Sequence, residues 1–185
     1  QGLKNMQESY PPGIFDRAAL DGTIHVEDEE AFATARLLAR QEGLANIMVS
    51  NGFASPECLA ELGPYMDAAN IDLKAFSEEF YAKRCGGRLA PVLDNLKRMA
   101  ELGWWLEITT LVIPGLNDSD RELAAAAAFI ANELGPHVPW HVSRFHPDFT
   151  LTDRGPTPVS TLERALAAGT RAGLLHVYVG NAPGH

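Results

Sequence analysis

Short apolar runs alternate with helical segments from residue 46 to the end of the chain, and this alternation constrains the fold more than any other feature. The runs are rich in Val, Ile, Leu and aromatic residues, as strands are. They cover residues 46–50, 68–74, 104–113, 138–145 and 175–179. Repeated strand–loop–helix units are crossover connections, so the pattern predicts an α/β fold with a parallel sheet. Because the runs are mostly apolar, we expect helices on both faces of the sheet.

The helical segments carry recognisable start signals. A capping hydroxyl, a proline and an acid follow one another in Ser55-Pro56-Glu57. Ser77 opens a second helical stretch, which we expect to continue past Gly86-Gly87. Capping boxes at Ser119–Glu122 and Ser160–Glu163 predict the starts of two further helices.

Charge and composition disfavour several classes of function. The net charge of −9, from 15 Lys and Arg against 24 Asp and Glu, disfavours a nucleic-acid binder, which needs a basic face. No apolar stretch is long enough to span a membrane, and the N-terminus lacks a signal-peptide pattern, so we expect a cytoplasmic protein without a membrane partner. Two cysteines, Cys58 and Cys85, are too few for a disulfide framework or a four-cysteine metal site. We expect both to be buried or half-buried thiols.

The second run carries a polar alternation at its end. Asn70, Asp72 and Lys74 are two residues apart, so a strand places all three on one face and the apolar residues between them on the other. Polar side chains on a sheet face need partners or water. Two interpretations are open: an internal ion pair, or a site for a charged ligand, which we favour. A zwitterion would suit the site, with its carboxylate at Lys74 and its cation at Asp72.

Other polar residues stand where strands end, which is where parallel sheets place their chemistry. Ser50-Asn51-Gly52 is either a turn or a contact to a polar ligand, and His146 is either a ligand contact or structural. We expect His141, inside its strand, to be a hydrogen-bonded core residue, and either Trp104 or Trp105 to be core. No Gly-rich phosphate loop, nucleophile elbow or HExxH motif is present, so the residues alone predict no complete catalytic set.

Five segments, in order and over about 140 residues, resemble the radical S-adenosylmethionine enzymes, in particular the activating-enzyme-like AmmeMemoRadiSam type. They are Val49–Gly52, Asn70–Phe76, Thr109–Asp118, Pro139–Asp148 and Tyr178–Gly184. The family fold is a partial (β/α) barrel of the TIM type with six strands. Residues 43–185 resemble its last four strands and a C-terminal extension, so we expect a barrel that is incomplete at its N-terminal side.

The resemblance implies a cofactor and its contacts. In the family, a [4Fe–4S] cluster reduces S-adenosylmethionine, and the resulting 5′-deoxyadenosyl radical abstracts hydrogen from a substrate. Asp72, Leu73, Lys74 and His146 match positions that contact S-adenosylmethionine, and Ser50 and Asn51 lie on the neighbouring strand end. The substrate is unknown, and a protein is one option.

The chain departs from the family at two motifs. The three cysteines spaced CxxxCxxC and the Gly-Gly-Glu segment that meets the methionine amine do not occur in it. A cluster needs three thiolates, so we expect the ligands of the iron–sulfur cluster to be absent and the chain by itself to be inactive. Two alternatives stay open: a non-catalytic truncated or hybrid α/β chain, and a remnant of a cysteine synthase.

The first 44 residues follow a different pattern. They resemble a fragment of the pyridoxal-phosphate-dependent cysteine synthases, without the lysine that holds that cofactor. The resemblance rests on Gln1–Met6, Pro11–Ile14, Asp21 and a helical pattern at 29–43. We predict a segment 1–44 that is not an independent domain, followed by a domain at 45–185, with the junction within 31–44. A natural fusion, a truncation and an assembly hybrid are all open.

The missing barrel strands lead to an expectation about the sheet. We expect an open sheet of four or five mainly parallel strands, with an apolar edge at residues 47–49 that favours association.

Overall fold

The structure is a computed structural model that describes residues 33–34, 37–39 and 41–182. The chain divides after Ala45 into two units, residues 1–45 and 46–185. In the first unit, residues 33–34, 37–39 and 41–42 are helical, as the helical pattern predicted. The rest of the predicted cysteine-synthase-like segment lies outside the described residues.

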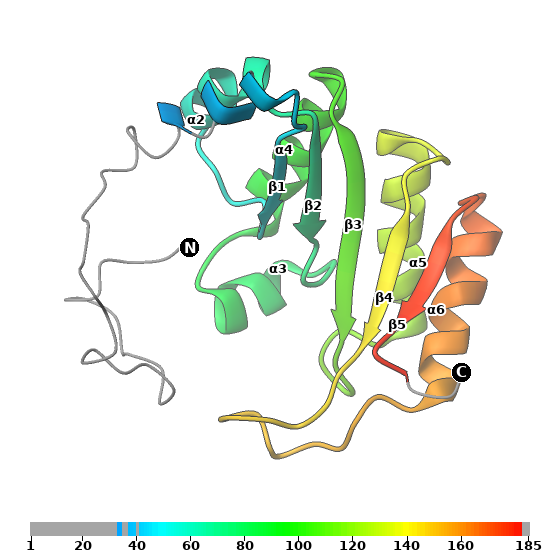
Figure 1. Ribbon diagram of the computed structural model, residues 1–185. Helices are drawn as coiled ribbons and strands as arrows, with labels where there is room; N and C mark the ends of the chain where they lie inside the picture. Colours follow the sequence, from blue (N-terminus) through cyan, green and yellow to red (C-terminus); the bar gives the residue numbers. More distant parts are fainter. Residues whose placement is uncertain (1–32, 35–36, 40, 183–185) are drawn as a thin grey trace. The chain divides into compact units, whose positions relative to one another are not determined.

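The second unit is a five-stranded sheet in which all neighbouring strands are parallel, in the order β1-β2-β3-β4-β5 (Figure 1). The strands are β1 (Ile47–Ser50), β2 (Ala68–Asp72), β3 (Trp105–Val112), β4 (Trp140–Arg144) and β5 (Val177–Gly180). The helices are α2 (Pro56–Leu62), α3 (Glu78–Phe80), α4 (Leu89–Glu101), α5 (Asp120–Phe129) and α6 (Val159–Ala172). Short helical turns complete them at η2 (Gly63–Tyr65), η3 (Tyr81–Cys85) and η4 (Ile130–Leu134). The predicted α/β class and the open parallel sheet are confirmed.

Local capping explains where three of the helices begin. The side chains of Ser55, Ser77 and Ser119 each accept a hydrogen bond from the backbone N–H three residues ahead, as N-caps do. The capping box predicted at Ser160 is wrong, because α6 begins after Pro158 with no side-chain cap. The helix predicted to run through Gly86 is also wrong, since Gly86 adopts a left-handed conformation that ends η3.

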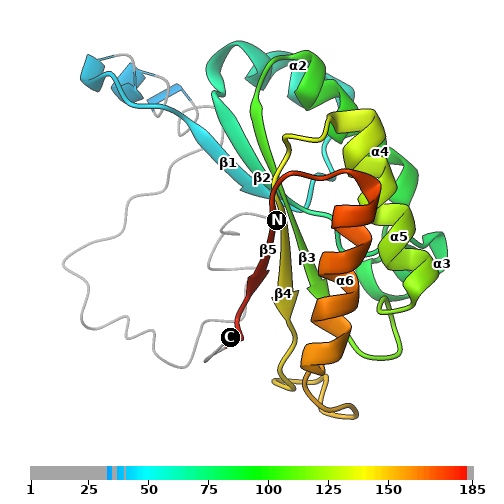
Figure 2. The ribbon, with the colours of Figure 1, turned by 90° about the vertical axis from the view of Figure 1, so that its right-hand side faces the viewer.

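The helices of this unit lie on one face of the sheet (Figure 2). Alternate strand residues point into the core beneath them, and the largest fully buried side chains include Ile71, Ile108 and Trp140. In the described part of the second unit, no helix covers the opposite face. Our expectation of helices on both faces is therefore wrong for these residues. The reason is visible in β2 and β3, whose buried apolar residues alternate with half-buried polar ones.

The exposed edge of the sheet is apolar, as predicted. Strand β1 has a single strand neighbour among the described residues, and its Ile47 and Val49 are 65% and 78% exposed. The other outer strand, β5, exposes Tyr178 and Val179. Association through these edges stays a prediction.

Three further residues test the sequence predictions about burial. Trp104 is buried and donates its indole N–H to the Gly63 carbonyl, whereas Trp105 is exposed, so the prediction that one of the pair is core is confirmed. Cys58 and Cys85 are exposed, so the prediction of buried thiols is wrong. Both lie on helical turns whose apolar neighbours, not the cysteines, face the core.

Candidate functional site at the carboxyl edge of the sheet

The candidate site centres on the segment that follows β2. Lys74 Nζ lies 2.6 Å from Asp72 Oδ2, and both side chains are partly open to solvent, at 40% and 37%. The predicted alternation is confirmed, since Ile71 and Leu73, on either side of Asp72, are fully buried. The ion pair matches the first of the two interpretations, but its solvent exposure leaves both groups accessible to a ligand. Exposed pairs of this kind contribute about 0–1 kcal/mol, so a charged ligand can displace the pairing at small cost.

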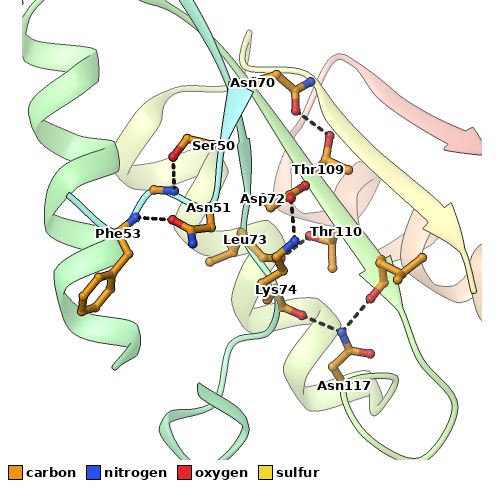
Figure 3. Close-up of polar contacts among 12 residues, drawn as sticks. Ser50, Asn51, Phe53, Asn70, Asp72, Leu73, Lys74, Thr109, Thr110 and Asn117 are labelled. Carbon is orange, nitrogen blue, oxygen red and sulfur yellow. Dashed lines mark hydrogen bonds and ion pairs between the residues drawn. The ribbon is translucent and has the colours of Figure 1, made fainter. Parts of the chain in front are cut away.

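The backbone of Lys74 is held from both sides. Its N–H donates to the Tyr81 hydroxyl at 3.1 Å. Its carbonyl accepts from Asn117 Nδ2 at 2.7 Å (Figure 3). Burial raises the pKa of Tyr81 to about 12, so its hydroxyl stays protonated and neutral. These contacts position the ion pair without using either charged group.

Asn117 joins the ends of two strands. Besides Lys74, its amide donates to the Leu111 carbonyl at 2.9 Å, while its carbonyl accepts from the Ile113 N–H at 2.6 Å. Its side chain is buried, so the three contacts are partly shielded from water. Asn117 lies within one of the segments that resemble the family, but this role was not predicted from the sequence. An asparagine directly after a strand and a Pro-Gly turn was the available signal.

A second buried chain of hydrogen bonds fixes Leu73. The Thr110 hydroxyl donates to the Leu73 carbonyl at 3.0 Å and accepts from the Trp140 indole N–H at 3.0 Å. Leu73 points its side chain into the core, so it can reach a ligand at this edge through its backbone alone.

Ser50 and Asn51 form a tight turn. Ser50 Oγ accepts from the Gly52 N–H at 3.2 Å, and Asn51 Oδ1 accepts from the Phe53 N–H at 3.0 Å (Figure 3). Gly52 has φ +72°, and a Cβ there would lie 2.8 Å from Ile71 Cγ2. The turn interpretation of this segment is therefore confirmed, and a ligand role for Ser50 and Asn51 stays a prediction.

His146 follows β4 at the same edge of the sheet as Lys74, because all the strands are parallel. It is exposed, and its Nε2 lies 3.4 Å from the Asn181 carbonyl. Among the described residues no hydrogen bond joins His146 to Asp72 or Lys74. A hollow of about 470 Å³ between α4 and α5 includes none of the six predicted site residues.

A polar network on the uncovered face was missed by sequence reasoning. Glu107 Oε2 lies 2.9 Å from His141 Nε2, and Asn70 Oδ1 accepts from the Thr109 hydroxyl at 2.9 Å. His141 stacks on Tyr178 with ring centroids 5.4 Å apart. His141 is hydrogen-bonded as predicted, but it is half-buried on this face and not in the core. The alternation of Glu107 and Thr109 within an apolar strand was the available signal.

The loop after β2 is tied to α5 by a carboxylate. Glu122 Oε1 accepts from the Phe76 N–H at 2.9 Å, whereas the predicted capping box would have turned it back to Ser119. Burial raises the pKa of Glu122. The carboxylate therefore stabilises the loop through its hydrogen bond, while the removal of its charge from water costs free energy.

The described residues do not fit an iron–sulfur cluster. Cys58 and Cys85 lie on α2 and η3, and no group of three His, Cys, Asp or Glu in the described residues could hold a metal. Desolvation also raises the pKa of the Cys85 thiol, which disfavours the thiolate that iron needs. None of the described helices has the length and apolar character needed to cross a bilayer.

Comparison with known proteins places this geometry in context. The radical SAM superfamily matches residues 19–128. An uncharacterized protein of Methanocaldococcus jannaschii is 44% identical over 149 residues, which are 80% of this chain and 44% of that protein. The isethionate sulfite-lyase activating enzyme of Desulfovibrio desulfuricans is 30% identical over 63% of this chain and 38% of its own length. The chain thus spans less than half of these relatives.

A solved structure has the same fold. A domain of the pyruvate-formate lyase-activating enzyme of Bacteroides vulgatus aligns with a TM-score of 0.69 and 19% identity, over 82% of this chain and 91% of that structure. The likeness concerns the fold alone.

Two comparisons concern the cysteine-synthase prediction. The superfamily match includes residues 19–44, for which we predicted a cysteine-synthase resemblance. A cysteine synthase of Aquifex aeolicus is 42% identical over 59 residues, which are 32% of this chain and 18% of that enzyme. The domain boundary near residue 44 stays a prediction.

Proposed function

Because the chain belongs to the radical SAM superfamily, we propose that it forms the part of such an enzyme that holds S-adenosylmethionine at the carboxyl edge of the sheet. The observation that carries the proposal is the accessible Asp72–Lys74 pair, fixed through its backbone at the end of β2. When bound in this family, S-adenosylmethionine supplies the means to abstract hydrogen from a substrate.

Each residue has a chemical role in the proposal. Lys74 would take the carboxylate of the methionine part, and Asp72 a hydroxyl or ammonium group. Leu73 would contribute its backbone. Ser50, Asn51 and His146, which stand at neighbouring strand ends, would contact the remaining polar groups.

The iron–sulfur cluster of the family does not enter this proposal. The chain has two cysteines, and the cluster needs three thiolates. Reconstitution with iron and sulfide under anaerobic conditions should therefore leave this chain without the visible absorbance of a cluster. Appearance of that absorbance would contradict our assignment of an inactive chain.

The finer assignment to the AmmeMemoRadiSam type is part of the proposal. It is supported by the motifs at residues 70–76, 109–118 and 139–148. The alternatives are a non-catalytic hybrid chain and a cysteine-synthase remnant, and pyridoxal-phosphate binding would favour the second. For the substrate, a protein is one option, since the activating enzymes among its relatives are named for lyases.

Calorimetric titration with S-adenosylmethionine tests the proposal. We expect weak binding, with Kd in about the millimolar range, because one lysine supplies the main charged contact. Lys74→Ala should abolish binding and leave the fold intact.

Lys83 provides a matched control. It also forms an ion pair at 2.6 Å, with Glu79, but it lies on η3 and is largely exposed. Lys83→Ala should bind like the unchanged chain. Binding that survives Lys74→Ala, or no saturable binding at all, would overturn the proposal.

A further inference from the structure

The uncovered face of the sheet carries one carboxylate at its centre, on β3. Glu107 is 37% exposed, and its hydrogen-bond partners from other strands are Asn70 and His141. Figure 2 shows the helices of this unit on the other face of the sheet. The proposed S-adenosylmethionine site lies further along the strands, at their carboxyl ends.

Hydrogen bonds hold the Glu107 carboxylate in one orientation. Its Oε2 takes the His141 contact at 2.9 Å and a long bond from Asn70 Nδ2 at 3.5 Å. Its Oε1 has a single long bond, from the Trp105 indole N–H at 3.5 Å. Oε2 is therefore held in place by its hydrogen bonds, and Oε1 can accept a further, stronger hydrogen bond.

The charge of Glu107 has no cationic partner among the described residues when His141 is neutral. A neutral imidazole donates a hydrogen bond without adding charge. Lys74, which follows the neighbouring strand β2, pairs with Asp72 at 2.6 Å. An exposed carboxylate flanked by aromatic rings attracts a cation both by its charge and by the faces of the rings.

Two exposed rings lie on this face, Trp105 beside the carboxylate and Tyr178 against His141. Trp105 is 62% exposed and Tyr178 is 50% exposed, and Tyr178 stacks between His141 and His176. Large exposed aromatic rings on one face are characteristic of binding surfaces. These rings provide an apolar surface for the body of a ligand whose charged end contacts Glu107.

We infer that the uncovered face binds the primary ammonium group of a ligand, with Glu107 as its anion and Trp105 and Tyr178 as its apolar walls. A primary ammonium fits better than a guanidinium, because only Oε1 is open and a guanidinium needs both oxygens for its bidentate contact. The inference rests on the proposed function in one respect, the identification of the ligand as the enzyme's substrate. That substrate would then be an amine.

Fluorescence titration at about pH 8 tests this inference. Of the three tryptophans, Trp104 and Trp140 are buried, so Trp105 reports on the uncovered face. N-acetyl-lysine amide should change the emission and saturate in about the millimolar range. N-acetyl-norleucine amide, which lacks the ammonium, should bind at least about tenfold more weakly.

Variants separate the charge from the fold. Glu107→Gln keeps the shape and should weaken the binding of N-acetyl-lysine amide at least about tenfold. Tyr178→Ala, at an exposed position, should weaken it several-fold. Glu133→Gln removes an exposed carboxylate of η4 and should change nothing.

The outcomes distinguish this inference from the proposed function. Equal binding by Glu107→Gln, equal binding of the norleucine amide, or tighter binding of N-acetyl-arginine amide would overturn the inference. Lys74→Ala should keep amine binding while losing S-adenosylmethionine. If the lysine amide fails to bind and S-adenosylmethionine binds, the inference falls and the proposed function stands. If the lysine amide binds and S-adenosylmethionine does not, the proposed function falls and the amine site stands.

Discussion

Replacing Asn117 should destabilise the chain more than any other single change near the candidate site. Its side chain is 2% exposed and makes three hydrogen bonds to backbone groups, at 2.6, 2.7 and 2.9 Å. Asn117→Ala leaves the carbonyls of Lys74 and Leu111 and the N–H of Ile113 without these partners.

The magnitude follows from the groups left behind. A buried backbone group that loses its partner costs about 1–3 kcal/mol. Because the strand end lies near solvent, water can reach part of the gap, so we take the lower limit for each group and expect a loss of about 3 kcal/mol. That is a large fraction of the roughly 5–15 kcal/mol that stabilises a typical domain.

Asn117→Asp is the more informative variant. The aspartate keeps an oxygen that accepts from the Ile113 N–H. Its other oxygen faces the carbonyls of Lys74 and Leu111, which accept hydrogen bonds from the Asn117 amide in the unchanged chain. The loss should be at least as large at neutral pH and should shrink in acid, where a protonated carboxyl can donate one bond.

Urea unfolding monitored by circular dichroism measures both variants, with the free energy obtained by linear extrapolation. Asn132→Ala is the control, because Asn132 lies on η4 away from these strand ends and should change the free energy of unfolding by less than about 0.5 kcal/mol. A free energy for Asn117→Ala within about 0.5 kcal/mol of the unchanged chain would refute the reasoning.

Three other changes have defined outcomes. Gly52→Ala should lower the Tm markedly in thermal unfolding, because φ is +72° and the new Cβ would lie 2.8 Å from Ile71; an unchanged Tm would contradict this conformation of the turn. Tyr81→Phe removes the acceptor for the N–H at the end of β2 and should cost about 1 kcal/mol in urea unfolding, with weaker S-adenosylmethionine binding. Glu122→Gln should raise the free energy of unfolding at neutral pH. Burial raises the pKa of Glu122, so the stability that its protonated form contributes is fully present below the ordinary pKa of 4.5 and is lost as pH rises through the folded pKa. The Gln variant should therefore gain over the unchanged chain as pH rises in thermal unfolding, and a constant difference would count against this.

Much of the fold was predictable from local patterns. All five strands and the serine caps of α2, α3 and α5 follow from signals within a few residues, because backbone alternation and capping are short-range effects. The same period of two placed Asp72 and Lys74 on one face. Where a left-handed glycine interrupted a helix pattern, at Gly86, the local signal was present and was misinterpreted.

The sequence by itself thus determined the order of elements and which residues share a face, but the tertiary structure decided what those residues contact. Asn117 bonds to a carbonyl 43 residues away, and Glu107 meets His141 34 residues away. The Glu122 carboxylate accepts a hydrogen bond from the loop after β2 instead of from the start of its own helix. Such contacts depend on the register of neighbouring parallel strands and on the packing of helices over one face, which bring together groups that no local period relates.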